Sequence, residues 1–106
     1  MTTNIITAII TAYCHCAQCC GTSGQPTASG KMPTVGVSVA GPRWMPFGTQ
    51  VWIPSVGWRT VQDRTARKYE GRVDIFMSSH KKAKKFGKRV ETIILINKPN
   101  NSLVSN

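Results

Sequence analysis

Six short segments rich in β-branched and aromatic residues constrain the fold of this chain more than any other feature of its sequence. They span 4–13, 35–40, 49–53, 58–63, 72–77 and 89–96. Such residues favour strands, and several short strands separated by glycine- and proline-containing loops are typical of small barrels and sandwiches. We therefore expect an all-β fold, in which PSVG connects the third and fourth segments as a hairpin.

One stretch, SSHKKAKKFGK, has the features of a helix instead of a strand. Ser78 or Ser79 can cap its N-terminus, lysines crowd its body, and Gly87 stands where a C-terminal stop belongs. The sequence therefore predicts one short α-helix, at about 79–86.

The length and composition of the chain fit one domain. Its 106 residues are 41% hydrophobic, which is enough for a single modest core. We place this domain at 1–98 and expect the polar tail at 99–106 to be frayed.

The N-terminal stretch MTTNIITAIITAYC is apolar, but it lacks a basic leading segment and a small-residue cleavage site. We interpret it as a strand and expect synthesis in the cytoplasm without a signal peptide. No apolar run approaches the roughly 20 residues that a membrane helix requires, so we expect no membrane span.

The charge balance bears on the partners of the protein. Lysine and arginine total 14 against four acidic residues, which gives a formal net charge of +10. Nucleic acid, an anionic membrane surface and an acidic wall polymer are all open as partners. The basic run Lys81-Lys82-Ala83-Lys84-Lys85 fits a solvated helix face, unspecific nucleic-acid contact or attraction to an anionic wall polymer.

Carboxylate chemistry can draw on only four side chains, namely Asp63, Glu70, Asp74 and Glu91. Asp74 lies inside a predicted strand, between two apolar residues, so it faces the opposite side from both. That side is either solvent or a cleft. Cleavage of a glycosidic bond needs a carboxyl group that protonates the leaving oxygen, often beside a second carboxylate. Alternatively, Asp63 and Asp74 only offset the charge of neighbouring arginines.

Further segments occur in a fixed order around these aspartates. They are TAY at 11–13, TASG at 27–30, PFGTQVWIPSVGW at 46–58, QDR at 62–64, GRVDIF at 71–76 and SHKKAKKFG at 79–87. Together they resemble the 3D domain, which is named for its three aspartates and is found in membrane-bound lytic transglycosylase A, some resuscitation-promoting-type wall enzymes and small phage proteins. The resemblance covers roughly residues 8–96. It departs from the family pattern at Gly41 or Pro42, where the first aspartate is missing, and at Thr65-Ala66, which replaces Gly-Gly.

The resemblance implies a six-stranded double-psi β-barrel and an activity on the bacterial cell wall. Asp74 matches the catalytic aspartate, which protonates the glycosidic oxygen of peptidoglycan and then deprotonates the 6-hydroxyl of the sugar, without water and without a cofactor. Asp63 would be its partner and would raise its pKa if the two carboxyl groups are close. This describes a monomeric lytic transglycosylase, of the phage endolysin or virion-associated kind, that acts at the wall after release. The alternative is a non-catalytic peptidoglycan-binding or structural module. A nucleic-acid-binding protein is less favoured, because only the charge supports it.

Five residues are candidates for substrate contact. All five belong to the matched segments, and four of them are Tyr13, Thr27, Ser29 and Arg64. The fifth is Trp52, which alternates with two apolar neighbours and is the best platform for a sugar ring among three tryptophans. Core packing is the competing role for at least one of these tryptophans.

The four cysteines, Cys14, Cys16, Cys19 and Cys20, fall within seven residues. Thiolates at this spacing can converge on one structural zinc. Disulfides, a nucleophilic cysteine paired with His15 or His80, and simple burial are the alternatives. Because the sequence has no evident signal peptide, zinc is favoured over disulfides.

Overall fold

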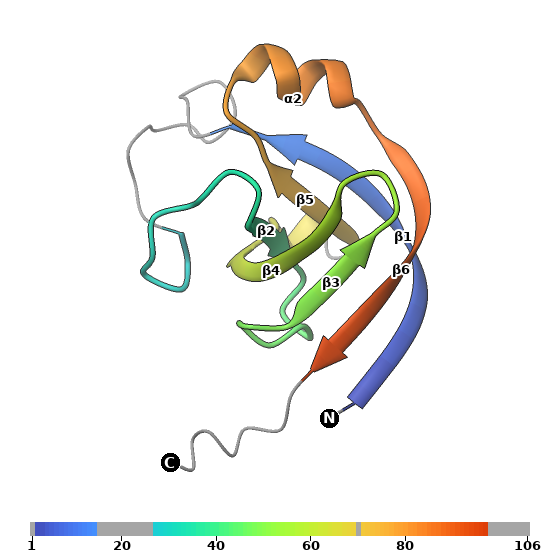
Figure 1. The fold of residues 1–106 in the computed structure, drawn as a ribbon. Coiled ribbons are helices and arrows are strands. Elements are labelled where there is room, and N and C mark those ends of the chain that lie inside the picture. Colours follow the sequence, from blue (N-terminus) through green and yellow to red (C-terminus); the bar gives the residue numbers. More distant parts are fainter. Residues whose placement is uncertain (1, 15–26, 70, 98–106) are drawn as a thin grey trace.

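Six strands close into a barrel in the order β1-β5-β2-β4-β3-β6 (Figure 1). The computed structural model describes residues 2–14, 27–69 and 71–97. The strands are β1 (Thr2–Tyr13), β2 (Ser38–Gly41), β3 (Gln50–Ile53), β4 (Gly57–Arg64), β5 (Arg72–Phe76) and β6 (Arg89–Asn97). A 3-10 turn, η1 (Arg67–Tyr69), precedes β5, and one α-helix, α2 (His80–Phe86), follows it. The predicted all-β barrel with one short helix is confirmed.

The two halves of the barrel are equivalent in topology. Exchanging β1 with β4, β2 with β5 and β3 with β6 leaves both the strand order and the directions of all pairs unchanged. The pairs β1–β5 and β2–β4 are parallel, and the pairs β1–β6 and β3–β4 are antiparallel. This twofold relation is the double-psi arrangement. The first and last strands close the barrel, and Thr2 is the register partner of Asn97.

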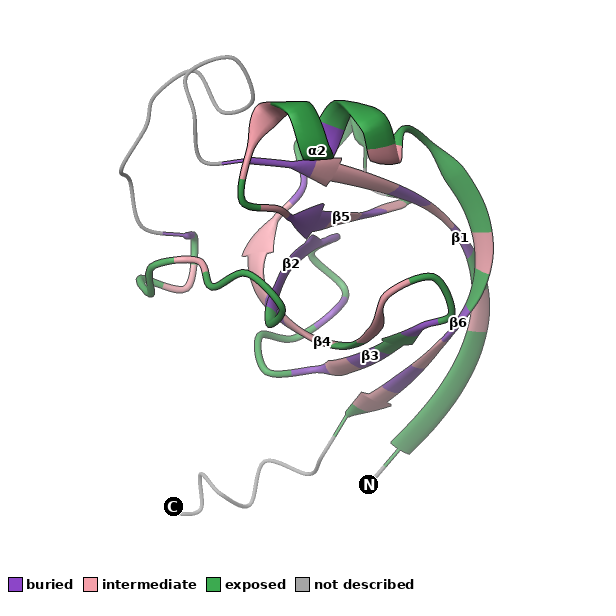
Figure 2. Ribbon diagram, turned by 45° about the horizontal axis from the view of Figure 1, so that its top comes forward, coloured by how far each residue is buried: buried purple, intermediate pink, exposed green. Residues whose placement is uncertain are grey.

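The interior is filled by alternate side chains from every strand. Those that are no more than 1% exposed include Ile10, Val39, Val51, Val61, Val73, Ile75 and Ile93. Figure 2 shows this alternation as buried and exposed segments along the ribbons. Because the interior is apolar, any polar site must lie on the outer face of the barrel or at its ends.

The helix packs against β1 at one end of the barrel (Figure 1). Ser79 is its N-cap and accepts a hydrogen bond from the backbone N–H of Lys82 at 3.1 Å. Within the helix, Ala83 is buried, whereas the lysines are exposed. Gly87 ends the helix with φ of 74°, a value that glycine adopts easily.

One predicted strand begins later than expected. Residues 35–37 form a turn, and β2 starts at Ser38. Gly36 has φ of 86°, and the backbone N–H of Ser38 bonds the carbonyl oxygen of Thr34 at 2.9 Å. These features close a turn, so the alternation of valine and glycine there does not extend the strand.

Neither helix within the described ranges has the length and apolarity to cross a bilayer. The predicted frayed tail at 99–106 lies outside the described residues, and so does most of the cysteine cluster.

Candidate functional site

Four residues form one row across the outer face of β1, β5, β2 and β4. Thr11 is the register partner of Asp74, Asp74 is the partner of Ala40, and Ala40 is the partner of Asp63. Cross-strand partners project from the same face of a sheet. The two aspartates therefore share a face, two strand spacings apart, which is about 10 Å between backbones. The small side chain of Ala40 lies between them.

A β-bulge places Asp63 in this row. Val39 pairs with Val61 but Ala40 pairs with Asp63, so Gln62 is the extra residue on β4. Val61 is fully buried, and strict alternation from it would turn Asp63 toward the core. One extra residue reverses the facing of the side chains that follow, which brings Asp63 to the outer face.

Asp74 is largely buried although it lies on the outer face of β5. Its Oδ1 accepts a hydrogen bond from the hydroxyl of Thr11 at 3.0 Å. Burial, which disfavours the charged form, raises the pKa of Asp74 from 3.8 to about 6. The Thr11 hydrogen bond and the positive charge of Arg72 lower this pKa, and the negative charge of Asp63 raises it by a smaller amount. The effect of Asp63 has the predicted direction, but burial is the main cause.

Asp63 accepts hydrogen bonds from three directions. Its Oδ1 accepts the backbone N–H groups of Ala28 at 2.9 Å and Arg64 at 2.8 Å. Its Oδ2 accepts the hydroxyl of Tyr13 at 3.3 Å. The carboxylate thus ties the end of β1 and the loop at 27–31 to β4.

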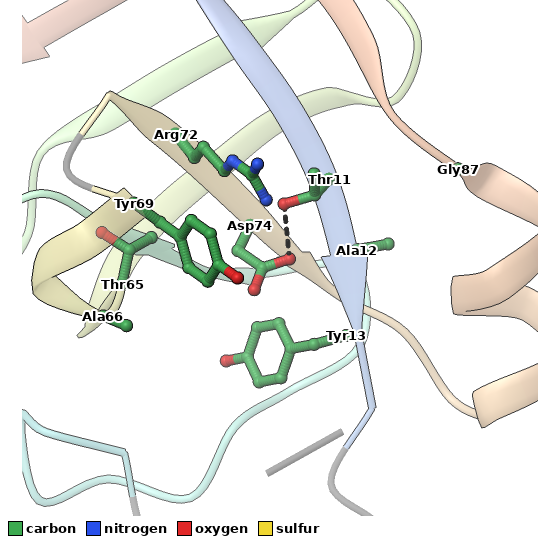
Figure 3. A pocket seen from close by; sticks show the side chains of 9 residues that line it. All are labelled: Thr11, Ala12, Tyr13, Thr65, Ala66, Tyr69, Arg72, Asp74 and Gly87. Atoms are coloured by element: carbon green, nitrogen blue, oxygen red, sulfur yellow. Dashed lines mark hydrogen bonds between the residues drawn. The ribbon is translucent and has the colours of Figure 1, made fainter. Parts of the chain in front are cut away.

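Two adjoining pockets, of about 320 and 390 Å³, open around Asp74. They share Tyr13, Thr65, Ala66, Tyr69 and Asp74. In Figure 3 the carboxyl group of Asp74 lies between the rings of Tyr13 and Tyr69, with the Thr11 hydroxyl on one side.

The first pocket reaches Thr11, Arg72 and Gly87 at the end of α2, and the second reaches Ala40, Asp63 and Arg64. The row of four residues therefore spans both pockets. Arginines stand at both ends of this space.

The two arginines are held by aromatic rings. The guanidinium of Arg72 lies 4.1 Å from the ring centroid of Tyr69, and that of Arg64 lies 3.9 Å from the ring centroid of Phe47. Arg64 also donates to the carbonyl oxygen of Met45 at 2.8 Å. Fixed cations beside an acid can bind polar or anionic groups of a substrate.

The structure brings some of the predicted site residues together and leaves others apart. Asp63, Asp74, Tyr13 and Arg64 meet at the pockets. Thr27, Ser29 and Trp52 do not line either of them.

The three remaining candidates lie in two other places. Thr27 is buried, and its hydroxyl contacts that of Ser29 at 2.9 Å. Ser29 lines a separate pocket of about 300 Å³ with Phe47 and Gln62. Trp52 lies on the outer face of β3, where its ring meets that of Trp58.

Gly41, one of the two positions at which the sequence departs from the 3D pattern that it resembles, faces the core. A Cβ atom at Gly41 would lie 3.1 Å from the sulfur of Met45 and 3.4 Å from Cγ1 of Val61. An aspartate there would point into apolar side chains, away from Asp74. Thr65 and Ala66 line both pockets.

Sequence reasoning did not assign Thr11, Ala40, Tyr69 and Arg72, which all line the pockets. Thr11 belongs to the TAY segment, but its contact with Asp74 depends on a parallel strand pair that joins residues 63 positions apart. Thr65 is 6% exposed, and its hydroxyl has no hydrogen-bond partner among the described residues.

The predicted zinc site cannot be placed from the described part of the chain. Cys14 is buried at the end of β1, whereas Cys16, Cys19 and Cys20 lie outside the described residues. Among residues 2–14, 27–69 and 71–97, no three histidine, cysteine or acidic side chains are grouped as metal ligands would be. The zinc site stays a prediction.

No protein-family model matches the chain, and no curated protein matches it in sequence.

Proposed function

We propose that the protein cleaves the glycan strand of bacterial peptidoglycan as a lytic transglycosylase, with Asp74 as acid and then base. The observation that supports this best is the position of Asp74 in an open pocket, with its pKa raised by burial to about 6. A carboxyl group of this pKa is protonated in a useful fraction of molecules near neutral pH and can give up its proton to a leaving oxygen.

The reaction needs one proton and returns it. Asp74 donates its proton to the glycosidic oxygen, and the bond between that oxygen and the anomeric carbon breaks. The Asp74 carboxylate then takes the proton of the 6-hydroxyl of the same sugar, whose oxygen bonds to the anomeric carbon and closes an anhydro ring. Asp74 ends protonated, no water is consumed, and no cofactor is needed.

The neighbours of Asp74 have distinct parts in this proposal. Thr11 bonds Oδ1 and fixes the plane of the carboxyl group, and the other oxygen points into the pocket (Figure 3). Asp63 holds the hydroxyl of Tyr13 at 3.3 Å and favours the protonated form of Asp74 by its charge. Tyr13 and Tyr69 offer ring faces to the sugars, and Arg64 and Arg72 offer donors at the two ends.

The resemblance to the 3D domain supports the same proposal and extends it to the setting. The protein is made in the cytoplasm and acts as a monomer at the bacterial wall, as a phage endolysin or virion-associated lysin does. Its partners are peptidoglycan and anionic wall polymers, and nucleic acid is not among them.

A second candidate function is peptidoglycan binding without turnover. The observation that favours it is that the first aspartate of the resembled pattern is missing, at Gly41 or Pro42, and that Gly41 faces the core. In this case the pockets hold the glycan strand, but Asp74 transfers no proton.

Substitution of Asp74 separates these functions. Purified peptidoglycan is incubated with the wild type, Asp74→Asn and Glu91→Gln, and the soluble products are analysed by mass. Glu91 is a matched control because its carboxylate bonds only Ser55 in the described structure, at 2.9 and 2.6 Å, outside both pockets. Each substitution removes one negative charge.

We expect the wild type and Glu91→Gln to release anhydro products, which are lighter than hydrolysis products by one water. Asp74→Asn should lower the rate by a factor of about 100 or more, which is typical of loss of a general acid. Equal cleavage by Asp74→Asn would refute the assignment of Asp74. Sedimentation of all three proteins with the wall, without products, would establish the binding module instead.

A further inference from the structure

A second row of side chains crosses the opposite part of the barrel. Ile5 is the register partner of Ile94, Ile94 is the partner of Trp52, and Trp52 is the partner of Trp58. The row runs over β1, β6, β3 and β4 and uses their outer faces, because the neighbours Val51 and Ile53 are fully buried. Four adjacent strands thus present an apolar line about 14 Å long.

Three of these four large apolar side chains are exposed, and Ile94 is half-buried. Ile5 is 68% exposed, Trp58 47% and Trp52 36%. Figure 2 shows the exposure along the N-terminal half of β1. The rings of Trp52 and Trp58 lie 5.5 Å apart and are inclined at 60°. Contiguous apolar residues that remain outside the core commonly mark a binding surface.

Hydroxyl and amide groups border the row along the strands. At the turn between β3 and β4, the guanidinium of Arg59 donates to the carbonyl oxygens of Val56 and Trp58, and Glu91 accepts hydrogen bonds from Ser55. On one side lie Thr3, Ile96, Gln50 and Thr60, which are register partners across the same four strands. On the other side Thr7 pairs with Thr92, and their hydroxyl oxygens are 3.4 Å apart. We call the residues of these three rows the tryptophan face. None of them is ionisable, in a chain that has 14 basic residues.

The charge distribution excludes several partners for the tryptophan face. An anionic polymer would need several free cations, whereas the three rows hold no basic residue and the guanidinium of neighbouring Arg59 is bonded to the carbonyl oxygens of Val56 and Trp58. A second copy of the chain would bring another net charge of +10 to the contact, and this repulsion opposes association. Strand addition is excluded because the barrel is closed and β3 is paired on both sides.

We propose that the tryptophan face binds an uncharged polysaccharide, separately from the pockets at Asp74. The C–H faces of sugar rings pack on the indoles, and their hydroxyl groups exchange hydrogen bonds with the threonines and with Gln50. The inference deepens the proposed function, because the choice of an N-acetylated wall glycan rests on it. The tryptophan face binds the polymer on one side of the barrel, while Asp74 cleaves a glycan strand on the other side.

The test uses insoluble chitin, an uncharged polymer of N-acetylglucosamine, and vesicles of neutral phosphatidylcholine. The proteins are the wild type, Trp52→Ala/Trp58→Ala, Trp52→Tyr/Trp58→Tyr and Trp44→Ala. Trp44 is a matched control because it is 57% exposed but lies outside the three rows. The fraction of protein bound is measured at physiological salt and at 1 M salt, and thermal unfolding checks that each variant is folded.

We expect the wild type and Trp44→Ala to bind chitin with little dependence on salt. The double alanine variant should bind chitin more weakly by a factor of about ten or more. The double tyrosine variant should retain most of the binding, because it keeps two ring faces. Equal binding by the double alanine variant would overturn the proposal. Loss of chitin binding in 1 M salt would also overturn it, as would binding to the vesicles in place of chitin. A wild-type protein that is a dimer, with a double alanine variant that is a monomer, would overturn it too.

The outcome is independent of the catalytic assignment. Chitin binding by Asp74→Asn at the wild-type level, together with cleavage of short soluble glycan fragments by the double alanine variant, assigns the two activities to separate surfaces. If the protein does not bind chitin, the proposed cleavage by Asp74 is unaffected. If Asp74 does not cleave the glycan, the proposed binding by the tryptophan face is unaffected.

Discussion

The protonation of one side chain, Asp74, determines when this site can act as an acid. Its pKa of about 6 results from burial, which raises it, and from Thr11 and Arg72, which lower it. The reacting form is the protonated one. We expect the cleavage rate to be highest below about pH 6 and to fall about tenfold per pH unit above it. A rate that rises between pH 6 and 8 would contradict this role.

Two substitutions should move this fall in rate in opposite directions. Thr11→Val removes a hydrogen bond that lowers the pKa of Asp74, so the fall should move to higher pH. Asp63→Asn removes a charge that raises this pKa, so the fall should move to lower pH. Thr11→Ser keeps the hydroxyl and should leave the profile in place. The pH dependence of cleavage measures all three, and shifts of the same sign would count against the electrostatic account.

The same carboxyl group affects stability. Its pKa is about 6 in the folded chain and about 3.8 when exposed. The folded state therefore binds the proton more tightly, and its stability falls as pH rises from about 4 through 6. The difference corresponds to at most about 3 kcal/mol, from 1.36 kcal/mol per pKa unit.

Asp74→Asn removes this penalty because the amide is never charged. We expect the variant to unfold at a higher temperature than the wild type at pH 8, and the difference to close near pH 4. Thermal unfolding across this range measures it. A variant less stable than the wild type at pH 8 would show that the carboxylate stabilises the barrel.

Among the secondary-structure elements, the helix could be predicted in detail from the sequence, because capping residues act locally. Ser79 bonds the N–H of Lys82, whereas Ser78 is exposed and precedes the cap. Ser79→Ala should lower the free energy of unfolding by about 1 kcal/mol, as loss of an N-cap does. Ser78→Ala should change it by less than about 0.5 kcal/mol. Urea unfolding compares them, and equal effects would refute the assignment of the cap.

The candidate site depends on contacts that could not be predicted from the sequence. The pattern of β-branched residues was enough to predict the strands and the outward facing of Asp74. The bulge at Gln62, however, has no distinct signal in WRTVQD, and without it Asp63 would face the core. The partners Thr11 and Ala40 reach Asp74 through pairing between distant strands. Alternation along one strand predicts which face a side chain takes, but not which residues lie beside it.

For the barrel as a whole, the net charge of +10 should govern binding to the wall. The exposed lysines of α2 can attract anionic polymers, and salt screens such attraction over about 8–10 Å. We expect the Asp74→Asn variant to bind purified wall less strongly as salt rises from low to physiological. Replacing Lys81, Lys82, Lys84 and Lys85 by alanine should weaken binding at low salt and reduce this dependence. Sedimentation with the wall measures both. Preferential binding of duplex DNA at physiological salt would favour a nucleic-acid partner instead.

The closure of the barrel by its first and last strands has a consequence for how the chain acquires its structure. Within the described part of the chain, β1 pairs with β5 and β6, so its partners in the sheet lie beyond residue 71. During synthesis the isoleucine-rich segment of β1 leaves the ribosome before β5 and β6, and both of its edges stay unpaired until these strands have been made. Contacts this distant in sequence form slowly, and an unpaired apolar strand readily joins another chain. We therefore expect the barrel to form only after β6 has left the ribosome, and its yield to depend on how well nascent chains are kept apart.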